Sequence, residues 1–219
     1  MKKAYCLFEC NNTFRDELKK RGYEAKSYSL NIEGQINFPD FNIDLFKSDL
    51  SFIEKKSLVC TFFPCKKFNT LSELRFKGCN GVKEQEKAIK ARNEYLQELL
   101  RELKILQEKN CKIIFENPIN YENRFLKNEL LNIGFNVLEF NNRIIYGDKF
   151  KKPTYFFYYN LEFNNDLQLI TYTDKKILKV CKGSCKKKGA TYRKENGVFI
   201  DVSEIEIEFV NNLLNMFEL

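Results

Sequence analysis

The sequence contains no histidine, and this absence excludes more chemistry than any other feature of the composition. Histidine is the usual general base of enzymes and the commonest metal ligand. Catalysis by Ser-His-Asp or Cys-His groups is therefore excluded, and so are zinc protease sites of the His-Glu-x-x-His type. Any acid–base step has to use Asp, Glu, Lys, Tyr or Cys.

Long apolar runs and chain-breaking residues are also scarce. No segment approaches the roughly 20 apolar residues that span a membrane, and the N-terminal apolar patch is too short for a signal peptide. We therefore expect a soluble, cytoplasmic protein without a membrane partner. Only four prolines and nine glycines occur in 219 residues, which leaves little room for a flexible linker and favours a single domain.

Aromatic and basic residues, in contrast, are abundant. The 21 Phe and 11 Tyr residues can fill an aromatic core. Lys and Arg number 37 against 30 Asp and Glu, which gives a formal net charge of +7, and lysines cluster within residues 149–152 and 175–188. Such clusters suit a polyanion such as DNA, although lysine runs also occur as plain solvated surface. The composition does not indicate an oligomeric state.

The beginning of the chain predicts a strand, a helix and a second strand. Residues 4–8 are apolar, a helix capped at Thr13 is expected up to Gly22, and residues 24–30 alternate as a strand. This is the βαβ opening of a doubly wound fold, whose first turn holds a nucleotide or cofactor. Glycine is usual in that turn because the backbone has to approach the ligand closely, but here the turn reads Glu9-Cys10-Asn11-Asn12.

A second stretch predicts a thiol at the working edge of the sheet. Residues 57–63 read as a buried strand, Pro64 ends it, and Cys65 follows. Lys66 and Lys67 come next and would favour the thiolate form of Cys65. The alternative is that Cys65 is a small core residue, since cysteine is among the most buried residue types.

A carboxylate is expected beside this thiol. A leucine-rich helix at residues 87–109 leads to a strand at residues 112–115, and Glu116 follows that strand. The carboxyl ends of neighbouring parallel strands lie at the same edge of a sheet. We therefore expect Cys65 and Glu116 to face each other there.

The rest of the chain completes the expected fold. A helix is predicted at residues 125–133, strands at 136–141, 143–146 and 153–159, and a terminal helix from Ser203 to Phe217. Together the elements predict an α/β, Rossmann-like, doubly wound and mostly parallel sheet. Residues 1–165 would form this core, and residues 166–219 a basic segment and a closing helix packed on the same domain.

Four short motifs, in this order, resemble the DNA cytosine-5 methyltransferases, and especially their compact phage-type members. They are Leu7-Phe8 before the first turn, Pro64-Cys65, Glu116-Asn117-Pro118, and Tyr146-Gly147-Asp148 followed by Lys152-Pro153-Thr154. The resemblance covers most of the chain and implies a class I methyltransferase core. It also implies that Cys65 attacks carbon 6 of a flipped-out cytosine, that Glu116 binds ring nitrogen 3, and that S-adenosylmethionine supplies a methyl group to carbon 5.

The resemblance also implies binding residues for the cofactor and for DNA. The cofactor would be held by Phe8, Cys10, Asn12, Asn31, Asp49 and Pro64. The lysines expected to contact DNA are Lys66, Lys67, Lys149, Lys151 and Lys152. Several features depart from the family: its glycine-bearing turn is missing, and Asn31 stands where an acidic residue should hold the ribose hydroxyls. Lys66 and Lys67 replace the family's small polar residues, and its downstream arginine is not assigned, with Arg143 as the candidate.

Three interpretations therefore remain open. The chain is a working methyltransferase that acts on cytosine or another nucleobase, or it has lost the cofactor and acts as a nucleic-acid-binding protein or an inhibitor of a protein partner, of the anti-restriction or anti-CRISPR type. Loss of glycine from the turn distinguishes these two, because it weakens cofactor binding. A third interpretation is a zinc site that uses Cys181, Cys185 and two further cysteines, without help from histidine.

Overall fold

The structure, a computed structural model, describes most of the 219 residues. The described ranges are 1–9, 11–31, 38–68, 81–119, 125–148, 152–164, 185–187, 190–195, 198–201 and 205–219. Among the residues singled out from the sequence, Cys10, Lys149, Lys151, Cys181 and Ser203 lie outside these ranges, and Lys66 and Cys185 are described by their backbone alone.

Seven strands form one sheet in the order β3-β2-β1-β4-β5-β7-β6. Neighbouring strands from β3 to β5 are parallel, whereas β7 is antiparallel to both β5 and β6. This order, with an antiparallel strand inserted next to the last one, is that of class I methyltransferases, and the predicted fold class is confirmed. In sheet order the strands are Phe41–Asn42, Glu24–Ser29, Lys3–Leu7, Leu58–Thr61, Lys112–Pro118, Thr154–Tyr159 and Asn136–Phe140.

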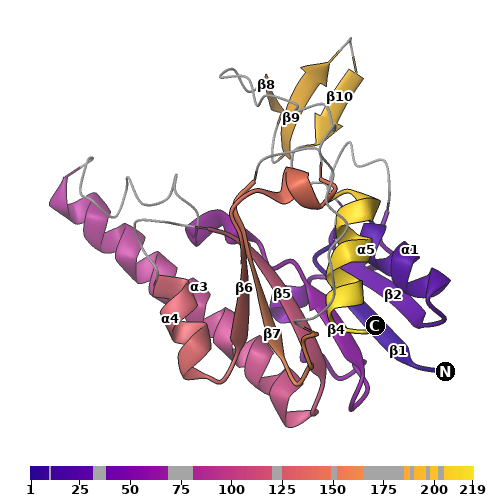
Figure 1. Ribbon diagram of the computed structural model, residues 1–219. Helices are drawn as coiled ribbons and strands as arrows, with labels where there is room; N and C mark the ends of the chain where they lie inside the picture. Colours follow the sequence, from indigo (N-terminus) through magenta and orange to yellow (C-terminus); the bar gives the residue numbers. More distant parts are fainter. Residues whose placement is uncertain are drawn as a thin grey trace.

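Helices cover both faces of this sheet (Figure 1). On one face α3 (Val82–Glu108) and α4 (Phe125–Asn132) bury their leucines against the strands, and on the other α1 (Thr13–Lys20) and α5 (Ile207–Met216) do so. All four residues of β4 are buried, because a central parallel strand is covered on both sides and needs no polar face. The leucines that recur at helical spacing in α3 pack in the hydrophobic core, as expected.

Three strands differ from the sequence-based expectation, the first being β4, which ends at Thr61 and not at Phe63. β5 runs on through Pro118 because its last three residues pair with β7, including Glu116 with Phe156, so Glu116 lies within a strand and not after it. The strand expected at residues 143–146 is instead a 3-10 helix, η3 (Arg143–Tyr146). The Asn142 side chain accepts a hydrogen bond from the Ile144 N–H at its start, and an Asn at this position favours a turn of helix over a ladder.

The described strands of the C-terminal segment form a separate three-stranded antiparallel sheet in the order β10-β9-β8. Figure 1 shows it above the main sheet, on the side where η3 lies. Its strands are β8 (Cys185–Lys187), β9 (Ala190–Glu195) and β10 (Val198–Asp201). Among the described helices, none is long and apolar enough to cross a membrane.

Candidate functional site

Cys65 and Glu116 line one cavity at the carboxyl edge of the sheet. The cavity has a volume of about 170 Å³. Its walls come from the ends of β1, β4 and β5 and from the turn before α1, and they are formed by Phe8, Glu9, Asn11, Phe14, Phe62, Phe63, Pro64, Cys65, Glu116, Lys152 and Ile205. The structure thus brings together the two residues that the sequence placed on neighbouring strands.

The thiol of Cys65 is held at the cavity by the turn that follows β4. β4 ends at Thr61, and Pro64 precedes a 3-10 helix, η2 (Cys65–Lys67), that begins at Cys65. The Tyr95 hydroxyl of α3 donates a hydrogen bond to the Pro64 carbonyl at 2.9 Å, and the Tyr95 ring packs on Phe63 with a centroid distance of 5.0 Å. Cys65 is half-buried and lines the cavity.

Glu116 lies between two cations. Its Oε1 is 3.4 Å from the Lys152 Nζ and 3.8 Å from an Nη of Arg143. Arg143 has no exposed surface and is held by a second carboxylate, that of Asp148. Thr154 joins the group, because its hydroxyl accepts a hydrogen bond from Arg143 and donates one to the Lys152 carbonyl at 2.9 Å.

From the sequence, Arg143 is only an unassigned candidate and is not placed in this site. It stands alone between two asparagines and two isoleucines in a stretch that was expected to be a strand. Its role depends on the 3-10 helix and on the fold bringing η3 next to β5. The signal in the sequence was the run Tyr146-Gly147-Asp148, which supplies its acidic partner.

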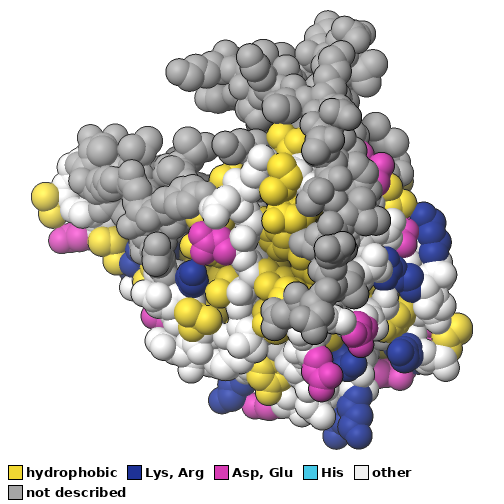
Figure 2. All heavy atoms as spheres, in the orientation of Figure 1, with side chains coloured by type: hydrophobic (Ala, Val, Ile, Leu, Met, Phe, Trp, Pro, Cys, Tyr) yellow, Lys and Arg dark blue, Asp and Glu magenta, His cyan; other side chains and the backbone are white. Residues whose placement is uncertain are grey.

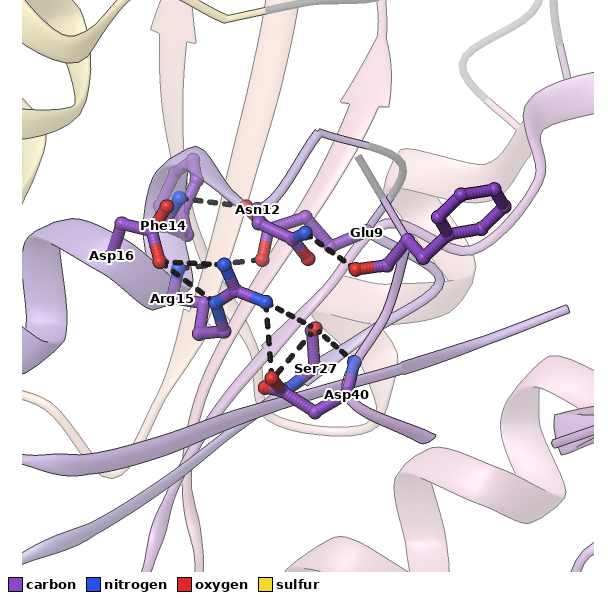
Figure 3. A network of polar contacts seen from close by, with 8 residues as sticks. Glu9, Asn12, Phe14, Arg15, Asp16, Ser27 and Asp40 are labelled. Atoms are coloured by element: carbon purple, nitrogen blue, oxygen red, sulfur yellow. Dashed lines mark hydrogen bonds and ion pairs between the residues drawn. The ribbon is translucent and has the colours of Figure 1, made fainter. Parts of the chain in front are cut away.

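Glu9 is a residue that the sequence did not single out, and it occupies the turn between β1 and α1 (Figure 3). Its carboxylate accepts hydrogen bonds from the backbone N–H of Phe14 at 2.6 Å and of Arg15 at 3.3 Å. Glu9 therefore caps α1, and not Thr13 as expected. Burial raises the pKa of Glu9 to about 7, and the two N–H donors oppose this effect.

Asn12 lies in the same turn, and its backbone is left-handed, with φ 62°. Its side chain donates a hydrogen bond to the Phe38 carbonyl at 2.8 Å. The segment that follows β2 is thereby tied to the turn. Arg15 forms a second contact between α1 and the segment after β2, because its Nη1 lies 3.1 Å from an oxygen of Asp40 (Figure 3).

The other residues expected to hold the cofactor are dispersed. Phe8 and Pro64 line the cavity, but Asn31 and Asp49 do not. The Asn31 N–H donates to the Asn42 side chain at 3.0 Å. The Asp49 carboxylate accepts a hydrogen bond from the Ser51 N–H, which lowers the pKa of Asp49.

S-adenosylmethionine does not fit the described part of this turn. The N–H groups at the start of α1 already bind a carboxylate of the chain. Asn12 adds a side chain at a position where a cofactor needs the close backbone approach that glycine allows. Pockets for ligands of this size usually enclose about 300–1,000 Å³, which exceeds the cavity at Cys65.

The predicted DNA-contacting lysines are described in part. Lys152 lines the cavity. Lys67, two residues after Cys65, is half-buried and does not line the cavity. On the face shown in Figure 2, apolar side chains gather near the centre, and the described Lys and Arg side chains are scattered toward the margins. Within the described residues, no group of three or more Cys, Asp or Glu could hold a metal ion.

No protein-family profile and no curated protein sequence matches this chain. Among solved structures, it is similar to a candidate DNA modification methyltransferase encoded within a prophage of E. coli. The two share 12% sequence identity with a TM-score of 0.47. The likeness covers 90% of this chain and 61% of the other, so this chain spans less than two thirds of the length of that protein.

Proposed function

We propose that this methyltransferase-fold protein binds DNA and captures an extruded cytosine in the cavity between Cys65 and Glu116. The observation that supports the proposal is that this thiol and this carboxylate, which are 51 positions apart in the sequence, line one cavity at the carboxyl edge of the sheet. A volume of about 170 Å³ suits a single pyrimidine ring. A base inside a duplex is out of reach of such a site, so the target has to leave the stack.

The chemistry we propose is reversible addition of the thiolate to the base. Cys65 Sγ forms a bond to carbon 6, and the carbon 5–carbon 6 double bond gives its electron pair to carbon 5 and, by conjugation, to the ring. The carboxyl group of Glu116 donates a proton to ring nitrogen 3, where negative charge develops, and takes this proton back when the addition reverses. Reversal of these steps restores both the thiolate and the double bond, so no further reactant is needed.

The remaining side chains of the site act by positioning. Arg143 and Lys152 hold the Glu116 carboxylate from two sides, which fixes the direction from which it meets the ring. Phe14 and Phe62 supply apolar walls, with a ring centroid distance of 4.8 Å. Apolar walls favour the flat faces of a base and exclude water.

DNA is the proposed partner because of the net charge and the lysines near the site. Lys152 borders the cavity, and Lys66, Lys67, Lys149 and Lys151 remain proposed phosphate contacts. The resemblance to cytosine-5 methyltransferases would add methyl transfer from S-adenosylmethionine. We derive no such step, because the turn before α1 does not fit the cofactor.

An oligonucleotide that carries 5-azacytosine tests this proposal. Its carbon 6 is more electrophilic than that of cytosine, and addition of the thiolate there is completed by protonation of ring nitrogen 5. We expect intact-mass spectrometry to show one covalent adduct per protein, and Cys65→Ser to abolish it.

Cys111→Ser is the matched control, because Cys111 is a buried thiol away from the cavity. It should form the adduct as the wild type does. DNA binding without any adduct would contradict the covalent role of Cys65. Absence of both would favour the alternative function, inhibition of a protein partner.

A further inference from the structure

We infer that the chain fills its own cofactor site with the side chains of Glu9, Asn12, Arg15 and Asp40, and that it therefore binds neither S-adenosylmethionine nor S-adenosylhomocysteine. The inference concerns the β1–α1 turn and the segment after β2, and it is independent of what the cavity at Cys65 does. Figure 3 shows these side chains converging on one another across the turn.

The anion-binding end of α1 is already occupied. A helix N-terminus attracts a carboxylate or phosphate because its first N–H groups point outward. Here two of them, from Phe14 and Arg15, bind the Glu9 carboxylate of the same chain. The carboxylate of a bound amino-acid moiety would have to displace a buried side chain or lie beside a like charge, and both are unfavourable.

The space between the turn and β2 is occupied as well. Asp40 lies directly before β3, and its carboxylate accepts hydrogen bonds from the Ser27 N–H at 2.8 Å and from Arg15 at 3.1 Å. The Asp40 N–H in turn donates to the Ser27 hydroxyl at 3.0 Å. The carboxylate of Asp40 thus lies beside β2 and already accepts hydrogen bonds from Ser27 and Arg15 of the same chain.

Asn12 links these two parts. It is buried, and its amide bonds the Phe38 carbonyl two residues before Asp40. A cofactor that lay over the turn would have to break this bond and the Arg15–Asp40 contact together. Asn12 is the buried member of this set, and leaving its amide unpaired would lower the affinity for a ligand by about ten- to a hundredfold.

Isothermal titration of the wild-type protein with S-adenosylmethionine and with S-adenosylhomocysteine tests the inference. We expect no saturable heat for either ligand up to about 1 mM, in a preparation that unfolds cooperatively by circular dichroism. Saturable binding of either ligand with a dissociation constant below about 100 µM would overturn the inference. A lack of binding leaves the adduct experiment above unaffected, so the two proposals fail separately.

Asp40→Asn tests whether the internal contacts are formed in solution, and Asp44→Asn is its control. Both side chains are 30% exposed and both form an ion pair, with Arg15 and with Lys47 respectively. We expect Asp40→Asn to lower the unfolding temperature by about 3 °C or more and Asp44→Asn by about 1 °C or less. Equal shifts would mean that the segment after β2 is not held on the turn, and this would overturn the inference.

Discussion

Arg143 combines complete burial with a full positive charge. A buried charge is tolerated only when opposite charges and hydrogen bonds compensate it. Glu116 and Asp148 supply the charges, and the guanidinium also lies 5.2 Å from the centre of the Phe209 ring. The same side chain thus stabilises the fold and orients the carboxylate of the candidate site.

Replacing Arg143 with Met should lower the free energy of unfolding by about 3–5 kcal/mol, because the buried Asp148 would lose its ion pair with the guanidinium. Urea denaturation followed by circular dichroism measures this. Arg101→Met is the control, since Arg101 pairs with Glu98 on the surface of α3, and such pairs contribute less than about 1 kcal/mol. Similar losses in both variants would show that Arg143 is not held as the structure has it.

Glu102 of α3 is buried in the core layer, and within the described residues its Oε1 has no hydrogen-bond partner. Burial raises the pKa of Glu102 to about 8, and the charge of Arg101 opposes this. The folded protein therefore keeps a proton that the unfolded chain loses above about pH 4.5. Stability from this group is present at low pH and is lost as the pH rises toward 8.

Glu102→Gln should remove this loss. We expect the variant to gain stability relative to the wild type between pH 5 and pH 8.5, by about 3 kcal/mol over that range. Chemical denaturation at several pH values gives the difference. Glu94→Gln, an exposed position on the same helix, removes no buried carboxyl and should show no comparable trend.

At the scale of elements, η3 and α5 meet at Gly147. Gly147 ends η3 with φ 106°, and a Cβ built on it would lie 2.8 Å from the Glu208 Cβ of α5. The Asn212 side chain adds a hydrogen bond from α5 to the Tyr146 carbonyl at 2.9 Å. Two segments about 60 residues apart in the sequence are joined there without room for a side chain.

Gly147→Ala should therefore destabilise the protein by more than backbone strain alone. Gly22→Ala is the matched control, because Gly22 also has a positive φ of 82° but no atom within 4 Å of its built Cβ. We expect a loss of about 1 kcal/mol for Gly22→Ala and about 3 kcal/mol or more for Gly147→Ala. Equal losses, measured by thermal unfolding, would argue against close contact between η3 and α5.

The sequence predicted the elements whose signal is local. Alternating or continuous apolar residues predicted β2 and β4, and leucines at helical spacing predicted α3. It failed for η3 and for the end of β5, because these depend on pairing partners far along the chain. β5 is extended by β7, which starts 36 residues after Pro118.

At the scale of the whole molecule, the net charge of +7 predicts that binding to DNA weakens as the salt concentration rises. Each phosphate contact that releases a counterion makes the association constant fall with salt, by a slope of about −0.9 in the log–log plot for duplex DNA. We expect Lys152→Ala to make this slope less steep by about 0.9, the value for one phosphate contact, in fluorescence anisotropy titrations. Lys90→Ala, at an exposed position of α3, should leave it unchanged.

Part of the candidate site could also be predicted from the sequence, and part depended on the tertiary structure. That Cys65 follows one strand and that Glu116 lies near the carboxyl end of another could be predicted from Pro64, from the apolar runs and from the motif Glu116-Asn117-Pro118. That the β1–α1 turn lacks glycine was also plain. Composition alone determined that no histidine takes part.

Only the tertiary structure decided what replaces the missing glycines and what surrounds the carboxylate. Glu9 meets the start of α1 within a few residues, but Asp40 reaches Arg15 across 25 positions and Arg143 reaches Glu116 across 27. Hydrophobic periodicity predicts which face of a helix or strand is buried, but it does not predict which distant charged residues form ion pairs. Charges that are far apart in the sequence become partners because the sheet order places their strands and turns at one edge.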